Sequence, residues 1–213
     1  MSTVSVSERS RLLGRGVWLE VLTIVWNAIE ALVAIAAGIA AGSVALVAFG
    51  LDSVIESTSG IALYRRLAFE LRGASEAESE ASERRALWFV GISFYLIAAY
   101  VLYDAVTSLM KGSAPESSPL GIALAAVSLV VMPLLAWAKL RTGKALGSRA
   151  LIADAAETFV CGYLSFALLL GLGLNAALGW WWADPVAALL MLPLIVKEGN
   201  EAIESARSGG NTH

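Results

Sequence analysis

The sequence predicts an all-α membrane protein with six transmembrane helices, and three observations support this fold class. Of the 213 residues, 58% are hydrophobic and only 15% are charged, whereas soluble domains carry about 25% charged residues. Six stretches reach the roughly 20 mostly apolar residues that a membrane-spanning helix needs. Lysine and arginine gather almost entirely on one side of these stretches. The composition therefore excludes a water-soluble domain, and the net charge of −3 argues against a nucleic-acid partner.

The six predicted spans follow one another along the chain, mostly with short connections. They lie at residues 16–39, 43–64, 86–110, 119–140, 150–174 and 183–204. Residues 1–15 are expected to form a polar N-terminal segment and residues 205–213 a short tail. The long connection is a polar run from Arg65 to Arg85, which no membrane interior would hold. Asp184-Pro185 predicts an N-cap and a proline at the first helical position of the last span.

The basic residues predict the orientation of the chain in the membrane. Fourteen of the fifteen lysines and arginines fall on one side of the predicted spans, and only Lys111 falls on the other. By the positive-inside rule, both termini then face the cytoplasm. Residues 180–182 are three tryptophans that precede the last span on the outer side, as in an aromatic belt. We expect a multi-pass protein of a bacterial inner membrane.

Seven acidic residues lie inside the first five predicted spans, where no lysine or arginine is expected at comparable depth to neutralise them. Each charge at a helix centre costs about 2.5–3.5 kcal/mol. Several such charges together require protons, cations or a water-filled cavity. Those near the two membrane boundaries, Glu20 and Asp104, can be solvated there. The full set is Glu20, Glu30, Asp52, Glu56, Asp104, Asp154 and Glu157.

Two of the spans carry a candidate metal site. Asp52 and Glu56 are four residues apart on the second span, so their carboxylates share one helix face. Glu157 and Cys161 repeat this spacing on the fifth span, with Asp154 about one turn earlier. At 1.5 Å per residue, both pairs reach the middle of the bilayer from opposite sides. Cys161 is a ligand or a small packing residue, and Asp154 a ligand or a group that solvates the inner vestibule.

The donor set predicts the class of ion. Several carboxylate oxygens with one thiolate suit a borderline divalent cation such as zinc, cobalt, cadmium or iron(II). We expect this ion to be cargo and expect no cofactor.

The two metal-site segments also resemble each other. Residues 45–56 read ALVAFGLDSVIE and residues 150–161 read ALIADAAETFVC, at a constant offset of 105. Each segment belongs to the middle span of a three-span half, and the two halves run in opposite directions. This pattern predicts a 3+3 inverted repeat with binding groups at the bilayer midplane, which is a recurring plan of transporters.

These motifs resemble the cation diffusion facilitator family, whose second and fifth helices typically read Ala-Asp-Ala-x-His/Asp-Ser-x-x-Asp. The similar segments here run from Gly42 to Glu56 and from Ala153 to Cys161, with Asn27 and Asp184-Pro185 as further points of similarity. In this sequence Glu157 replaces the usual histidine and Cys161 the usual aspartate. The resemblance covers residues 20–204 and implies a six-helix cation transporter, often a homodimer and often exchanging metal for protons. A short, divergent member without the usual C-terminal cytoplasmic domain is expected.

The sequence therefore predicts a secondary transporter that moves a divalent metal cation across the membrane, by efflux in exchange for protons. The alternative is a membrane metal-binding or regulatory subunit that does not transport by itself. An enzyme is not expected, because the chain has no Ser/His pair, no HExxH motif and no Asp-rich phosphotransferase motif. The single histidine, His213, is the last residue.

Overall fold

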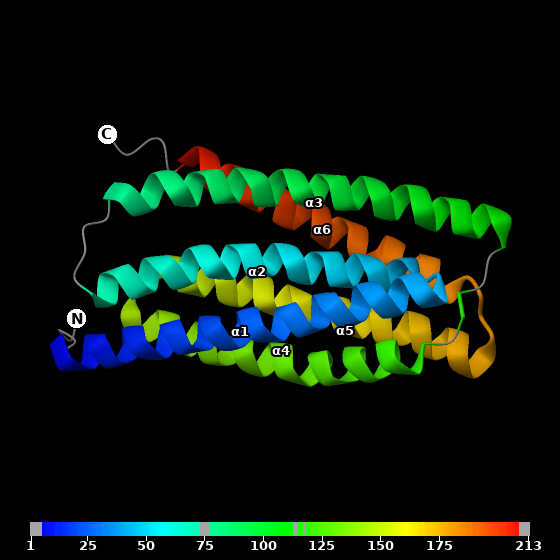
Figure 1. Ribbon diagram of the computed structural model, residues 1–213, viewed down its shortest axis with the longest axis horizontal. Coiled ribbons are helices and arrows are strands. Elements are labelled where there is room, and N and C mark those ends of the chain that lie inside the picture. Colours follow the sequence, from blue (N-terminus) through cyan, green and yellow to red (C-terminus); the bar gives the residue numbers. More distant parts are fainter. Residues whose placement is uncertain (1–5, 73–76, 113–114, 117, 209–213) are drawn as a thin grey trace.

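The computed structural model describes residues 6–72, 77–112, 115, 116 and 118–208, and all of its regular structure is α-helical. Six long helices run side by side along one axis (Figure 1). This confirms the predicted all-α class. The helices are α1 (Val6–Ala41), α2 (Val44–Leu71), α3 (Ala77–Lys111), α4 (Pro119–Leu146), α5 (Arg149–Leu178) and α6 (Ala183–Ser208).

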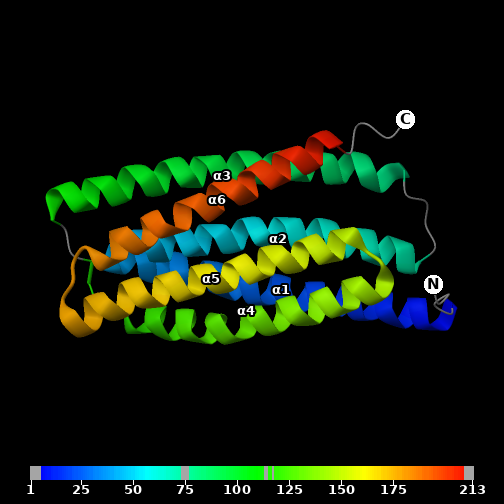
Figure 2. The ribbon, with the colours of Figure 1, turned by 180° about the vertical axis from the view of Figure 1, so that it is seen from behind.

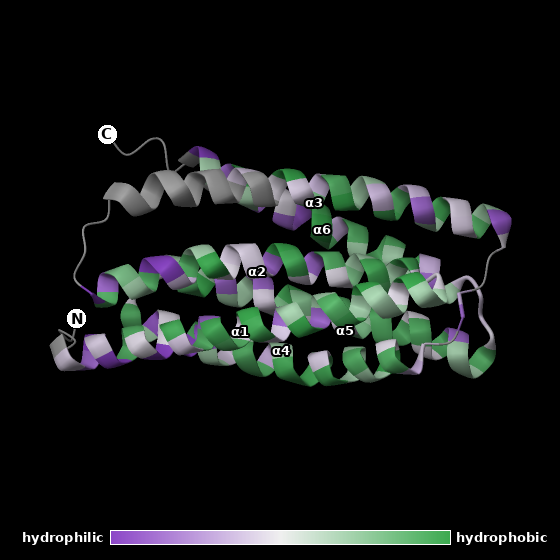
Figure 3. Ribbon diagram, viewed as in Figure 1, coloured by the Kyte–Doolittle hydropathy of each residue, from purple (hydrophilic) through white to green (hydrophobic). Residues whose placement is uncertain are grey.

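Five of the six described helices, α1 to α5, are long and apolar enough to cross a membrane. Apolar residues dominate the middle of the bundle, whereas polar residues gather at the end where the N-terminus lies (Figure 3). The chain is therefore a multi-pass membrane protein. α6 fails the same test because every 18-residue stretch within it holds at least three charged residues. The sixth span stays a prediction.

The helices extend well beyond the apolar stretches from which they are predicted. α1 begins at Val6, ten residues before the predicted span, and α2 continues to Leu71. Since α3 already begins at Ala77, most of the polar run between Arg65 and Arg85 is helical. Hydropathy locates the apolar part of a helix, but a helix can continue into a polar environment through residues such as glutamate and arginine.

α1, α2, α5 and α4 form a four-helix ring in which each helix packs against the next. α3 and α6 pack closely against each other and cover the α2 and α5 side of this ring (Figures 1 and 2). Their backbones nearly touch, because a Cβ added to Gly91 would lie only 3.1 Å from the carbonyl oxygen of Gly199. Both ends of the described chain lie at the same end of the bundle, which we call the terminal end (Figure 1).

The turns that join α1 to α2 and α4 to α5 are alike, position for position. Gly42 and Gly147 both take left-handed backbone angles, with φ of 66° and 69°, which glycine adopts without steric cost. Ser43 and Ser148 then cap α2 and α5 by accepting a hydrogen bond from the backbone. The two turns keep the offset of 105 and lie at opposite ends of the bundle (Figure 1). The inverted repeat of whole halves stays a prediction.

A second pair of glycines brings the helices of each hairpin together just before these turns. A Cβ on Gly38 would lie 2.8 Å from the backbone nitrogen of Val47. The equivalent Cβ on Gly143 would lie 3.1 Å from the backbone nitrogen of Ile152. At Gly38 a larger side chain would force its neighbours to shift, and at Gly143 the facing backbone would have to give by a few tenths of an ångström.

Asp184 caps a different helix from the one the sequence indicates. α6 begins at Ala183, so Asp184 already lies in its first turn. Its carboxylate accepts hydrogen bonds from the Ser43 hydroxyl at 2.5 Å and the Val44 backbone N–H at 3.0 Å. These groups open α2, so the expectation of an α6 N-cap was wrong and the carboxylate instead joins the first turns of α2 and α6.

Candidate metal centre

Asp52 and Glu56 of α2 meet Cys161 of α5 in the buried core. One potential ligand atom from each residue lies within 4.8 Å of the others. Their exposed fractions are only 6%, 6% and 1%. The spacing of four residues turns both carboxylates of α2 toward the same neighbour. Three of the five predicted metal residues thus form one cluster, which we call the metal centre.

The carboxylates of the metal centre are poorly satisfied. No hydrogen bond or ion pair reaches Asp52 from the described residues. The Oε2 atom of Glu56 is buried without a hydrogen-bond partner. Burying a charged oxygen in this way is costly unless a cation or a proton compensates it. Two carboxylates and one thiol are also a donor set that a borderline divalent cation accepts.

Glu157 borders the metal centre but does not belong to the tight cluster. Its carboxylate accepts a hydrogen bond from Ser59 of α2 over 3.2 Å, one turn beyond Glu56. It also lines a small cavity of about 20 Å³ together with Asp52 and Glu56. The remaining lining residues are Phe94 of α3, Val160 of α5 and Glu198 of α6. Glu198 is not among the site residues that the sequence predicts.

Asp154 lies outside the metal centre and forms a buried ion pair. Its Oδ2 atom is 2.5 Å from the Nζ atom of Lys139, which is also 3.2 Å from Glu20 Oε2. Lys139 and Glu20 are completely buried. The expectation that no basic residue lies among the buried acids was therefore wrong, as was the expectation that Glu20 is solvated at a boundary. α4 continues seven residues past Lys139 to Leu146, so the lysine is well inside the helix.

Thr158 connects this ion-pair network with the metal centre. Its hydroxyl oxygen lies 3.3 Å from Lys139 Nζ and 3.0 Å from Glu56 Oε1. The hydroxyl can therefore accept a hydrogen bond from the lysine and donate its single proton either to this carboxylate or to the Asp154 backbone oxygen, which is also 3.0 Å away. One signal for this role is visible in the sequence, because Thr158 is four residues after Asp154 and shares its helix face.

Glu30 of α1 is a second buried carboxylate with a different environment. It accepts hydrogen bonds from the Trp26 indole at 2.7 Å and the Ser53 hydroxyl at 3.2 Å, and from the Ser128 hydroxyl. Three donors satisfy this group without a metal. The neighbouring Asn27 is fully buried, and neither of its side-chain polar atoms has a hydrogen-bond partner among the residues that the structure describes. Asp104 is half-buried and accepts a hydrogen bond from Tyr100 at 3.4 Å.

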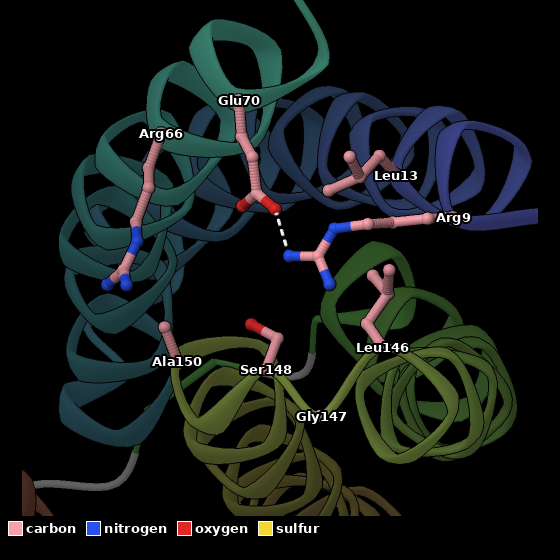
Figure 4. Close-up of a pocket in the computed structure, with 8 residues that line it drawn as sticks. All are labelled: Arg9, Leu13, Arg66, Glu70, Leu146, Gly147, Ser148 and Ala150. Atoms are coloured by element: carbon pink, nitrogen blue, oxygen red, sulfur yellow. Dashed lines mark hydrogen bonds and ion pairs between the residues drawn. The ribbon is translucent and has the colours of Figure 1, made fainter. Parts of the chain in front are cut away.

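A larger pocket of about 350 Å³ lies at the terminal end of the bundle, between α1, α2 and the turn from α4 to α5. Arg9 Nη2 lies 2.5 Å from Glu70 Oε1 across this pocket, and Ser148 lines the opposite side (Figure 4). No predicted metal residue lines it. Glu70 follows Glu56 by fourteen residues, which is about 21 Å along a helix. The pocket is therefore separate from the metal centre.

Comparisons with known proteins extend over most of the chain. The cation efflux transmembrane domain matches residues 21–208. An uncharacterized transporter of Synechocystis is 30% identical over 152 residues, which are 70% of this chain and 49% of the relative. Transmembrane protein 163 of Xenopus laevis is 27% identical over 87% of this chain and 65% of its own length. An uncharacterized transporter of Methanocaldococcus jannaschii is 26% identical, with shares of 83% and 63%. The chain spans half to two thirds of these relatives.

Proposed function

The chain belongs to the cation efflux family, the cation diffusion facilitators, and we propose that it is a secondary transporter for a divalent metal cation. The family consists of membrane transporters, not of enzymes. In the proposed cycle, Asp52, Glu56 and Cys161 bind the cation between α2 and α5 and release it on the other side of the membrane. Glu157 borders these ligands, so we expect it to replace one of them on the cation when the site opens to the other side of the membrane.

The observation that carries this proposal is a cluster of acidic and sulfur ligands without a counter-cation. Three ligand atoms approach within 4.8 Å of one another in the bundle core. The buried cation, Lys139, is already held by Glu20 and Asp154. Packing alone gives no reason to keep Asp52 and Glu56 at this depth, because buried charges without partners destabilise a fold. A transported cation supplies the missing charge.

The ligand chemistry supports a borderline ion. A thiolate ligand favours zinc, cadmium and related ions over magnesium, whereas carboxylate ligands also bind cobalt and iron(II). We propose zinc, cobalt, cadmium or iron(II) as the cargo.

Proton exchange follows from the same ligands. Metal ligands must be deprotonated, so a cation that enters the centre expels protons from it. When the cation leaves, carboxylates this close together cannot all stay ionised and take protons up again. We therefore propose metal efflux by proton antiport. The distribution of basic residues supports cytoplasmic termini, and the family resemblance supports a homodimer. A bacterial inner membrane stays the proposed location.

Reconstitution tests this function directly. The purified protein is placed in liposomes that contain a pH-sensitive dye, and uptake of zinc, cadmium, cobalt and manganese is followed. Asp52→Asn and Glu56→Gln are expected to abolish both binding and flux. Glu70→Gln is the matched control, because it removes an exposed carboxylate from the same helix. Flux in the Asp52 and Glu56 variants equal to that of the unaltered protein would contradict the site. Tight binding without any flux would instead identify a metal-binding subunit.

A further inference from the structure

We propose that Glu198 of α6 is a further cation-binding residue, so that the transported ion is held by three helices instead of two. The inference rests on the proposed function. Glu198 lines the same small cavity as Asp52, Glu56 and Glu157. Its exposed fraction is only 6%, although it lies in the polar second half of α6. Its position predicts a direct contact with the ion.

The carboxylate of Glu198 has no direct partner among the described residues. No hydrogen bond or ion pair to it is found anywhere in the described chain. The adjacent Lys197 faces away, because its Nζ atom pairs with Glu201 at 3.1 Å and both side chains are more than half exposed. A buried carboxylate without a partner costs free energy that only a cation or a proton removes.

The packing of α3 against α6 holds Glu198 in this place. Gly199, the next residue, lets α6 approach α3 so closely that an added Cβ would lie 3.1 Å from Phe94 Cβ. Phe94 itself is buried and closes one side of the cavity. With Gly199 turned toward α3, Glu198 lines a cavity that residues of α2 and α5 also line.

The cavity has the size and the lining that a single ion needs. Its volume of about 20 Å³ exceeds the roughly 10–15 Å³ that one water molecule requires. Four carboxylates and two apolar side chains line it, and no basic residue does. Cys161 is not among the lining residues of this cavity, but Asp52 and Glu56 belong both to the cavity and to the cluster with Cys161. Glu157 and Glu198 thus add carboxylate oxygens around the ion that Asp52 and Glu56 bind.

A thiol introduced at position 198 tests whether cadmium binds at this position. The purified full chain carries Cys161→Ser to remove the native thiol, and Glu198→Cys is added. With one equivalent of cadmium, the double variant is expected to show the ultraviolet absorption of a cadmium–thiolate bond, and Cys161→Ser alone is not. Adding Asp52→Asn should remove the band, because the ion is shared. Glu201→Cys in place of Glu198→Cys is the exposed control and should show no band.

A second measurement needs no introduced thiol. Glu198→Gln is expected to weaken cadmium and manganese binding at least about tenfold, the size of effect that residues around a metal commonly have. Glu201→Gln should leave the affinity unchanged. Glu198→Gln should not lower the melting temperature without metal, because it removes an unpaired charge. Normal affinity in Glu198→Gln together with no band in Glu198→Cys would overturn the Glu198 assignment alone. Failure of the unaltered protein to bind any of these ions would overturn the proposed function itself.

Discussion

Thr158 of α5 donates a hydrogen bond to Glu56 of α2, with 3.0 Å between Oγ1 and Oε1. The same oxygen lies 3.3 Å from the Nζ atom of Lys139. The hydroxyl has a single proton, for which the Asp154 backbone oxygen, also at 3.0 Å, competes with Glu56, while its lone pairs can accept from the lysine. A neutral residue thereby orients a proposed metal ligand. It also joins this ligand to the ion-pair network of Lys139, Glu20 and Asp154, whose members lie on α4, α1 and α5.

Thr158→Val should weaken metal binding without unfolding the protein. The variant leaves Glu56 Oε1 without its donor, and loss of an orienting partner commonly costs about 10–100-fold in metal affinity. Thr158→Ser keeps the hydroxyl and should bind as the unaltered protein does. Isothermal titration calorimetry in detergent measures both affinities. Equal affinities for valine and threonine at this position would show that the hydrogen bond does not orient the ligand.

Lys139→Met should destabilise the fold. It leaves Glu20 and Asp154 buried without their cation, and breaking a buried ion pair from one side costs about 3–5 kcal/mol. The melting temperature should drop clearly, and adding Asp154→Asn should recover part of the loss because one unpaired charge disappears. Lys144→Met is the control on the same helix, since Lys144 is exposed. An unchanged melting temperature in Lys139→Met would mean that the network does not stabilise the bundle.

Cys161→Asp should change the preference among ions. The substitution exchanges a soft sulfur donor for a hard oxygen, and ligand softness and geometry decide selectivity more than raw affinity does. We expect a shift away from cadmium and zinc and toward manganese or cobalt. Competition titrations across the four ions measure it. If the relative affinities do not change, Cys161 only packs in the core.

Metal binding should weaken as the pH falls. Protons and metal compete for Asp52, Glu56 and Cys161, and only the deprotonated groups bind the ion. Low pH therefore stabilises the metal-free centre, and binding should release protons that calorimetry in buffers of different ionisation enthalpy can count. In liposomes without a membrane potential, an imposed proton gradient should drive metal uphill. A metal affinity that does not depend on pH, together with a metal flux that does not depend on the proton gradient, would contradict antiport.

The parts of the site that the sequence predicted are the local ones. A spacing of four residues places Asp52 and Glu56 on one helix face whatever surrounds them. The antiparallel course of the second and fifth spans then suffices to bring Cys161 to them. Composition alone also identified α1 to α5 as apolar helices of spanning length.

The missed parts depend on contacts between distant segments. Lys139 stands near the end of an apolar stretch, where sequence indicates a solvated basic residue, yet α1 and α5 enclose it with Glu20 and Asp154. Glu198 lies among charged residues of α6, and only its packing between α3 and the α2–α5 pair buries it. Which charged residues pair across two helices depends on how those helices are tilted and rotated against each other. The periodicity of one helix carries no information on that arrangement.

The glycine contacts at the two like turns set how closely the helices of each hairpin pack. A Cβ added at Gly38 would lie 2.8 Å from the backbone nitrogen of Val47, and one added at Gly143 would lie 3.1 Å from that of Ile152. α2 and α5 begin at these turns and carry the three residues of the metal centre. A larger residue at either glycine is therefore expected to displace one helix of the centre relative to the other, although neither glycine is a ligand.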